Sequence, residues 1–464
     1  MIPDSIHAAC GRAHDLRRTG HAKAAEVGYR QILRFVPYYE EAALSLAFML
    51  REQGRLGSAG KVILDYWSAA ERSPDHDLKA IKFLSECGRH DDARNIVEMA
   101  VRDYPGNAAL MEQAAVVAHA LGSFDEAARL YRLVLRIDPQ RPGAWLRLAN
   151  THVYDEVESQ EALAEMERLL ATSTGGELRA ALGFCKGKIL DDIGRHAAAC
   201  DAWRNANELV QGAAGFPAQK VHPVPSHRWR LAPPTQAQDR APLFLVGMPR
   251  SGTTLLSRLL ARMGDVRERG ELGWLPELLA RMGDSPSTDV LKQAREIYLQ
   301  QLFQDDNPTR WYVDKNPLNY RHLAAVAALF PEAQVIFMHR SPRDVALSLW
   351  SQHFAHEDMR WSYRFEDIAA EMEHCLQALK DGRNLLGDRL CVVEYKDLVV
   401  RPDSVIAELG AWLGTEEHKN QPAADGAITT ASVWQARQPI YLTSLERWRR
   451  YQDYLPELAG FDPR

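Results

Sequence analysis

Residues 243–254 read Leu-Phe-Leu-Val-Gly-Met-Pro-Arg-Ser-Gly-Thr-Thr. The first five form an apolar run typical of a buried strand, and the Leu-Leu-Ser-Arg-Leu-Leu that follows predicts a helix. A strand, a glycine-containing loop and a helix N-terminus together form an anion site, because the N–H groups of the loop and of the first helical turn point at the ligand. The stretch therefore predicts an α/β domain that binds an anion at this loop.

The spacing of Gly247 and Gly252 is that of the nucleotide P-loop, but Thr253-Thr254 stands where a P-loop has Lys-Ser/Thr. The P-loop lysine serves the β- and γ-phosphates, and the hydroxyl holds Mg²⁺. Here the loop's cation is Arg250, which suits a ligand with one phosphate-linked anionic group. The missing lysine argues against a P-loop kinase or nucleotide hydrolase, which is one rival interpretation.

The segment 249–254, Pro-Arg-Ser-Gly-Thr-Thr, resembles the 5′-phosphosulfate loop of sulfotransferases that use PAPS (3′-phosphoadenosine-5′-phosphosulfate), especially the protein-tyrosine sulfotransferase branch. The resemblance covers about residues 241–464. It implies a P-loop-type α/β domain with a central parallel sheet, PAPS as co-substrate and no metal. It also assigns the donor's 5′ end to Arg250, Ser251, Gly252, Thr253 and Thr254.

Further motifs of this family follow in the family's order. Gln334–His339 predicts a second buried strand, and an arginine at its end with a serine eight residues later can converge on one phosphate. By resemblance, Arg340 and Ser348 bind the 3′-phosphate, Lys315 lies beside the transferring group, and Tyr395 lies near the adenosine. Ser432 matches a serine near the donor, and we count it with the catalytic residues. Arg437 is expected to replace a charge that the family often places where this chain has Gln438.

An acceptor hydroxyl needs a base to remove its proton. Glu271 stands at the spacing where the tyrosine branch carries its catalytic glutamate, and Glu268 is its nearest rival. Arg250 and Lys315 are expected to neutralise the charge that develops on the leaving group. The branch's arginine three residues after the glutamate is replaced by Trp274, which could stack on an aromatic acceptor or belong to the core.

The N-terminal half is a repeat. Gly20, Gly54, Gly88 and Gly122 are each 34 residues apart, and an alanine stands five residues after each one, at Ala25, Ala59, Ala93 and Ala127. Glycine ends the first helix of a pair, and the small alanine lets two helices approach closely. Gly194 and Ala199 suggest a further unit. The pattern resembles the tetratricopeptide repeat and predicts an α-solenoid over 1–210, a Pro/Gly-rich linker over 211–241 and the sulfotransferase domain over 242–464.

Composition bounds the remaining choices. The net charge of −6 gives no global basic field for nucleic acid or anionic membrane. The six cysteines form no CxxC pair and no Cys/His cluster in the sequence, so neither disulfides nor structural zinc is predicted. The N-terminus does not read as a signal peptide, and no apolar stretch reaches the roughly 18 residues that span a bilayer. These features predict a cytoplasmic protein.

The sequence leaves the acceptor open. We expect a tyrosine phenol of a peptide or protein, recruited by the repeat array, because such arrays present an extended binding surface. A small phenol, a glycan or a lipid hydroxyl is the alternative. A repeat-based adaptor with a non-catalytic nucleotide-binding domain is the alternative of another class. The partner of the array and the oligomeric state are not determined by the sequence.

Overall fold

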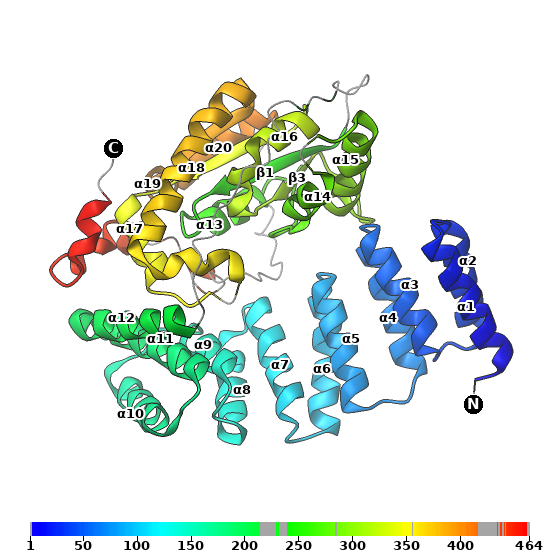
Figure 1. Cartoon of the computed structure of the whole chain (residues 1–464). Helices are drawn as coiled ribbons and strands as arrows, with labels where there is room; N and C mark the ends of the chain where they lie inside the picture. Colours follow the sequence, from blue (N-terminus) through cyan, green and yellow to red (C-terminus); the bar gives the residue numbers. More distant parts are fainter. Residues whose placement is uncertain are drawn as a thin grey trace. The chain divides into compact units, whose positions relative to one another are not determined.

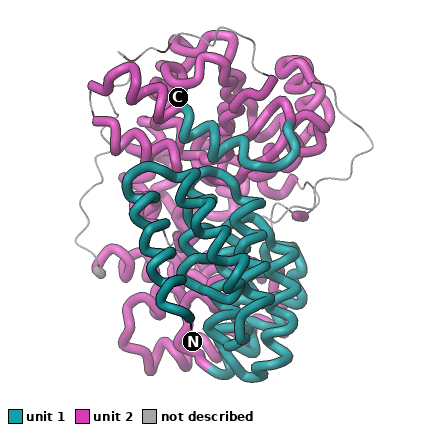
Figure 2. The backbone as a smooth tube through the Cα atoms, turned by 90° about the vertical axis from the view of Figure 1, so that its right-hand side faces the viewer, with its two compact units in different colours: residues 1–137, 296–308 teal, residues 138–295, 309–464 magenta. Residues whose placement is uncertain are grey.

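The computed structural model describes residues 2–213, 229, 231, 239–283, 285–354, 356–415, 434, 437–438, 440 and 442–461. Much of the predicted linker and part of the C-terminal region fall outside these residues. The described chain divides into two compact units, coloured separately in Figure 2. One comprises residues 1–137 and 296–308, and the other comprises residues 138–295 and 309–464.

The first unit is built from four antiparallel helix pairs, which follow one another in Figure 1. They are α1 (Asp4–Arg18) with α2 (Ala22–Phe35), α3 (Glu40–Glu52) with α4 (Leu56–Ala69), α5 (Pro74–Glu86) with α6 (His90–Asp103), and α7 (Ala108–Leu121) with α8 (Phe124–Ile137). The repeat glycines all have positive φ, between 70° and 84°. The four alanines are fully buried at 0% exposure, so the predicted helical repeat is confirmed.

The second repeat is contacted by a segment from much later in the chain. The end of α15 (Thr288–Phe303) and the residues after it belong to this unit. Asp305 Oδ1 accepts from Gly57 N at 2.8 Å, and its Oδ2 accepts from the backbone and side chain of Ser58 at 2.9 and 2.7 Å. Gln301 Nε2 donates to the carbonyls of Arg51 and Glu52 at 3.3 and 2.6 Å. A carboxylate thereby satisfies N–H groups that the start of α4 leaves unpaired.

The second unit begins with four helices, which are followed by a parallel sheet and its own helices. The first four helices are α9 (Pro142–Ala149), α10 (Glu156–Thr172), α11 (Gly176–Asp192) and α12 (His196–Ala213). Gly194 has φ 74° and Ala199 is fully buried, so the further unit predicted from these residues is confirmed. The strands are β1 (Ala241–Gly247), β2 (Val266–Glu268), β3 (Trp311–Asp314), β4 (Gln334–His339) and β5 (Leu390–Glu394), in the order β2-β3-β1-β4-β5.

Every strand pair is parallel, with Leu243 opposite Val313 and Val246 opposite Phe337. The core sits on both faces of β1, because alternate side chains point to opposite faces. Leu243 and Leu245 pack in one cluster with residues of α13 (Thr253–Leu260), α19 (Tyr395–Val400) and α20 (Pro402–Leu413), three helices that are labelled in Figure 1. Phe244 instead meets Phe330, with ring centroids 5.7 Å apart.

The remaining helical elements complete the unit. They are α14 (Trp274–Met282), η2 (Pro317–His322), α16 (Leu323–Leu329), α17 (Pro342–Trp350), η3 (Glu357–Tyr363), α18 (Phe365–Leu386), η4 (Gly387–Arg389), η5 (Leu442–Ser444), η6 (Arg447–Arg450) and η7 (Pro456–Gly460). The predicted fold class, a helical repeat array followed by an α/β domain with a parallel sheet, is confirmed.

Candidate active site

The predicted site residues follow the carboxyl ends of neighbouring strands. The anion loop follows β1, Lys315 follows β3, Arg340 follows β4, and Tyr395 follows β5. The strand order places β1 at the centre, with β3 on one side and β4 on the other. Ligands of open parallel sheets bind outside the carboxyl ends of the strands, where the connections diverge to opposite sides. The sheet therefore brings these loops to one edge.

The loop after β1 is held in a conformation that few side chains adopt. Arg250 has φ 70°, and Gly252, just before α13, has φ 107°. A Cβ on Gly252 would lie 2.4 Å from the Tyr395 ring, and one on Gly247 would lie 2.3 Å from the Met338 carbonyl oxygen. Both glycines are therefore required by close packing, and the loop has little freedom to rearrange.

Two arginines and a serine meet beside this loop. Arg250 Nε donates to Ser348 Oγ at 3.0 Å, and Arg340 Nη1 donates to the carbonyl of Arg250 at 2.9 Å. The guanidinium carbon of Arg340 lies 4.3 Å from the centre of the Tyr395 ring. The structure thus brings together Arg250, Ser348, Arg340 and Tyr395, which the sequence places as much as 145 positions apart.

The second part of the site is an ion pair at the end of β3. Lys315 Nζ lies 2.7 Å from Glu271 Oε1, and the lysine side chain is 1% exposed whereas the glutamate is 44% exposed. Buried Asp314 accepts from Leu272 N at 3.2 Å, which fixes the loop that carries Glu271. The N–H of Lys315 donates to the Gly270 carbonyl at 2.8 Å. Glu271 and Lys315 are therefore held against each other by backbone bonds as well as by charge.

Two buried polar atoms near the loop after β1 have no hydrogen-bond partner in the described part of the chain. Ser251 is 1% exposed, and its hydroxyl has no hydrogen-bond partner among the described residues; the same holds for the Nε of Arg340. Buried polar groups are normally hydrogen-bonded, so unpaired ones beside cations fit an anionic ligand. Arg250, Arg340 and Lys315 supply positive charge, and the residues present therefore fit a donor with two phosphate-type groups.

For two predicted site residues, the described structure gives little or no position. Ser432 lies outside the described residues. Arg437 is half-buried in a stretch of which only a few residues are described. Thr253 and Thr254 are buried at the start of α13, where the resemblance places them. Trp274 is half-buried as the first residue of α14, next to fully buried Leu275.

Three supporting residues were missed by the sequence reasoning. Asp314 is described above, and its position at the end of a buried strand was a usable signal. Ser444 accepts from Arg340 Nη2 through its carbonyl at 2.8 Å, and its hydroxyl lies 2.9 Å from the Tyr395 hydroxyl. Asp344 accepts from the N–H groups of Glu446 and Trp448 at 3.0 and 3.1 Å. No sequence pattern marks the last two, because their partners are about 50 to 105 residues away.

His322, His339 and His353 have partners other than the pair of Lys315 and Glu271. Burial, with the charge of Arg321, lowers the pKa of His322 to about 4. Burial also lowers the pKa of His353, which packs against Phe184 at a ring distance of 5.6 Å. His339 Nδ1 lies 2.9 Å from Glu394 Oε2. None of these three is described in contact with Lys315, whose partner is Glu271.

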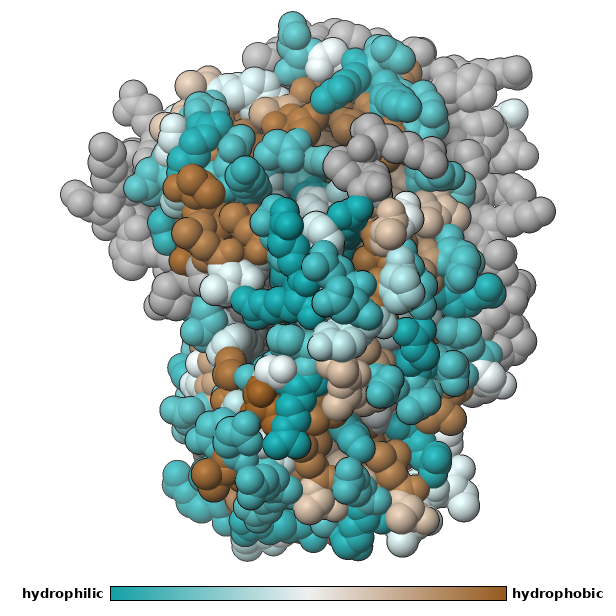
Figure 3. Space-filling view, turned by 90° about the vertical axis from the view of Figure 1, so that its left-hand side faces the viewer, coloured by the Kyte–Doolittle hydropathy of each residue, from teal (hydrophilic) through white to brown (hydrophobic). Residues whose placement is uncertain are grey.

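Among the described residues, no helix is both long and apolar enough to cross a membrane. The face of the chain shown in Figure 3 carries hydrophobic residues in several patches among hydrophilic ones.

Comparison with known proteins identifies the domain. Residues 242–419 match the sulfotransferase family. An uncharacterized protein of Aquifex aeolicus (strain VF5) is 25% identical over 90% of this chain, and protein-tyrosine sulfotransferase 1 of Danio rerio is 25% identical over 46% of it. The alignments span 59% and 66% of those relatives' own lengths. The solved sulfotransferase domain from the curacin biosynthetic pathway is 16% identical with a TM-score of 0.34, covering 47% of this chain and 98% of that one. The chain thus carries, at residues 242–419, a domain of the sulfotransferase family, whose members in general use PAPS, and a tetratricopeptide-like array precedes it.

Proposed function

We propose that this domain transfers a sulfuryl group from PAPS to an acceptor hydroxyl, with Glu271 as the base. The observation that carries the proposal is the 2.7 Å pair between Glu271 and the fully buried Lys315, at the same sheet edge as the arginine-containing anion loop. A buried cation is costly unless it is paired, and the partner of Lys315 is the carboxylate of Glu271, which is itself exposed. An exposed carboxylate beside it is accessible to an acceptor.

Different residues would bind the 5′ end and the 3′-phosphate of the donor. The N–H groups of 251–254 and the Arg250 guanidinium would hold the 5′ end, as in other helix N-terminal anion sites. Arg340 and Ser348 would bind the 3′-phosphate. The contact between Arg250 and Ser348 supports a single continuous donor site, because it joins the two motifs directly.

Transfer in this site would be governed by positioning and charge. The acceptor oxygen forms a bond to sulfur while the bond from sulfur to the bridging phosphate oxygen breaks, and the acceptor proton passes to Glu271. Lys315 and Arg250 neutralise the negative charge that grows on the leaving phosphate oxygen. In-line transfer between two oxygens needs little covalent participation by the protein, so fixed cations account for most of the catalysis.

For the acceptor, we propose a tyrosine phenol on a peptide or protein. Similarity to a protein-tyrosine sulfotransferase and the half-buried Trp274 three residues after Glu271 support this choice. The helical array supports recruitment of an extended chain. A small phenol, glycan or lipid hydroxyl is the competing acceptor class.

The base is tested by a matched pair of substitutions. Glu271→Gln should lower turnover by roughly 10²-fold or more, as expected for loss of a general base. Glu268→Gln, three residues away on β2, should leave turnover nearly unchanged. Release of adenosine 3′,5′-bisphosphate, measured with tyrosine peptides as acceptors, provides the readout. If the two variants exchange these results, Glu268 is the base.

The donor site is tested separately from catalysis. Adenosine 3′,5′-bisphosphate should raise the melting temperature by mass action, and adenosine 5′-phosphate should raise it much less. Equal shifts would remove Arg340 and Ser348 from the 3′-phosphate role. No shift from either nucleotide would favour an adaptor with a non-catalytic domain.

Recruitment by the array is tested with acceptor length. If the array binds the acceptor, kcat/KM should rise as the peptide is extended well beyond the tyrosine, because remote contacts contribute to transition-state binding. A simple phenol should then be a poor acceptor. A kcat/KM that does not change with length would show that the array has another role.

A further inference from the structure

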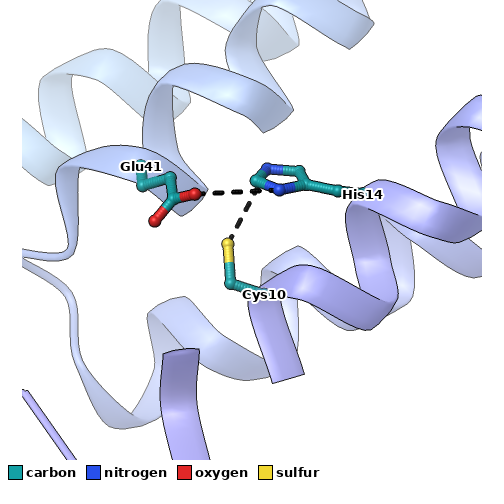
Figure 4. Close-up of side chains that lie close together, drawn as sticks. All are labelled: Cys10, His14 and Glu41. Carbon is teal, nitrogen blue, oxygen red and sulfur yellow. Dashed lines mark hydrogen bonds and ion pairs between the residues drawn. The ribbon is translucent and has the colours of Figure 1, made fainter. Parts of the chain in front are cut away.

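The first helix pair contains a group of side chains that sulfuryl transfer does not use. Cys10 and His14 stand four residues apart on α1, so they project from the same face of that helix, and Glu41 comes from the first turn of α3. Figure 4 shows the three side chains facing one another. His14 Nε2 lies 3.8 Å from Cys10 Sγ, and His14 Nδ1 lies 3.7 Å from Glu41 Oε1. One ligand atom from each residue lies within 4.8 Å of the others.

A second layer of hydrogen bonds orients these side chains. The Tyr39 hydroxyl donates to Glu41 Oε2 at 2.5 Å, and His7 Nδ1 lies 2.9 Å from the same hydroxyl. His14 Nε2 lies 3.0 Å from Ser45 Oγ, so an Nε2–H donated to Ser45 leaves the lone pair of Nδ1 on the side of Glu41. Metal-binding histidines and carboxylates are commonly held by such outer partners.

Buried atoms line one side of the group. Cys10 is 1% exposed, so its sulfur is shielded from water. Fully buried Tyr29 packs with its ring 5.5 Å from that of His14, and its hydroxyl has no hydrogen-bond partner among the described residues.

We propose that Cys10, His14 and Glu41 bind one Zn²⁺ ion. Thiolate, imidazole and carboxylate are the three donor types that Zn²⁺ uses, and their bond lengths imply ligand atoms about 3.4–3.6 Å apart in a tetrahedral site. The 3.7 Å separation is to Nδ1 of His14 and the 3.8 Å separation is to its Nε2, so a single ion would use only one of these nitrogens. One ligand atom from each residue lies within 4.8 Å of the others, and side-chain shifts of about 1 Å would bring the three to this geometry. One thiolate and one carboxylate balance the charge of the ion.

The fourth position would be open to water, because the side chains of His14 and Glu41 are 36% and 54% exposed. The ion would join α1 to α3 and thereby tie the first helix pair to the second. This role is independent of sulfuryl transfer, and its test does not use activity.

The test measures Zn²⁺ binding to the full chain without an affinity tag, by competition with a chromophoric chelator. We expect one Zn²⁺ per chain. Cys10→Ser and Glu41→Gln should each weaken binding at least about 10-fold, since even outer-shell changes cost 10- to 100-fold. Cys391→Ser and Glu40→Gln are the matched controls, because they remove a thiol and a neighbouring α3 carboxylate that lie outside the group. Both controls should bind like the original chain.

Co²⁺ provides a second readout, because its absorption reports a thiolate ligand. The thiolate-to-cobalt band should appear with the original chain and with Cys391→Ser, and it should be absent with Cys10→Ser. If Cys10→Ser does not fold, the exposed substitution Glu41→Gln decides through Zn²⁺ affinity. Absence of stoichiometric Zn²⁺ binding, or equal affinity in Glu41→Gln and Glu40→Gln, would overturn the proposal.

Discussion

Gly54→Ala tests the close packing of the second repeat. Gly54 has φ 70°, and a Cβ there would lie 2.1 Å from the Gln300 carbonyl oxygen and 2.5 Å from its carbon. Both atoms are backbone, so no side chain can rotate to relieve the contact. The same repeat position at Gly88 has φ 72° and nothing within 4 Å. Gly88→Ala is therefore a matched control with the same backbone requirement and no crowding.

The expected magnitude follows from this difference. Both substitutions carry the cost of a left-handed conformation, about 1–2 kcal/mol. Gly54→Ala must in addition displace the segment that carries Gln301 and Asp305, whose hydrogen bonds reach the loop at 2.6–3.3 Å. A neutral bond contributes about 1 kcal/mol and one to a charged group about 1.5–3 kcal/mol. If the displacement breaks about one bond of each kind, the excess cost of Gly54→Ala should be roughly 2–4 kcal/mol.

Hydrogen exchange is the suitable assay, because a chain with two compact units need not unfold in one step. The amides of Gly57 and Ser58, which bond to Asp305, should exchange roughly 30- to 900-fold faster in Gly54→Ala than in Gly88→Ala. Equal exchange in the two variants would refute the packing of Gln300 against this loop.

Three further predictions concern the second unit. Lys315→Met should lower turnover by at least about 10²-fold while the melting-temperature shift with adenosine 3′,5′-bisphosphate persists; full turnover would contradict its catalytic role. The pKa of His322 in the folded chain is about 4, below the usual value of about 6.5, so the free energy of unfolding should be highest above about pH 6.5 and should fall as the pH falls toward about 4. In urea titrations this pH-dependent fall should be smaller in His322→Asn than in the original chain, by up to roughly 3 kcal/mol. Identical pH profiles of the two proteins would exclude His322 as the cause. Asp191 accepts from Arg447 and the Tyr451 hydroxyl, so Asp191→Asn should lower the free energy of unfolding by roughly 2–4 kcal/mol, whereas exposed Asp201→Asn should change it by less than about 0.5 kcal/mol; equal effects would contradict the assignment.

The repeat was predictable because its determinants are local. A glycine that ends a helix and an alanine at a helix crossing are required by their sequence neighbours, and the same two requirements recur every 34 residues. Gly54 shows a contact that the local sequence does not predict. Its sequence context matches that of Gly88, yet only Gly54 meets Gln300, because that contact joins positions 246 residues apart.

In the candidate site, too, the local features were predictable and the long-range contacts were not. The anion loop and Arg340 stand at strand ends that the apolar runs predict. The residues that hold Arg340 and Tyr395 in place come from 442–448, and no local pattern connects that segment to β4. Likewise, the spacing of Cys10 and His14 is visible in the sequence, but the approach of Glu41 depends on how α3 packs against α1.

Arg250 has a consequence for protein engineering. A non-glycine residue at φ 70° carries a conformational cost of about 1–2 kcal/mol in every folded molecule, whether or not a donor is bound. A screen that selects only for heat resistance would therefore favour glycine or asparagine at this position. Such a variant would gain stability by giving up the guanidinium that we assign to the donor, so in this domain resistance to heat is a poor guide to retained activity.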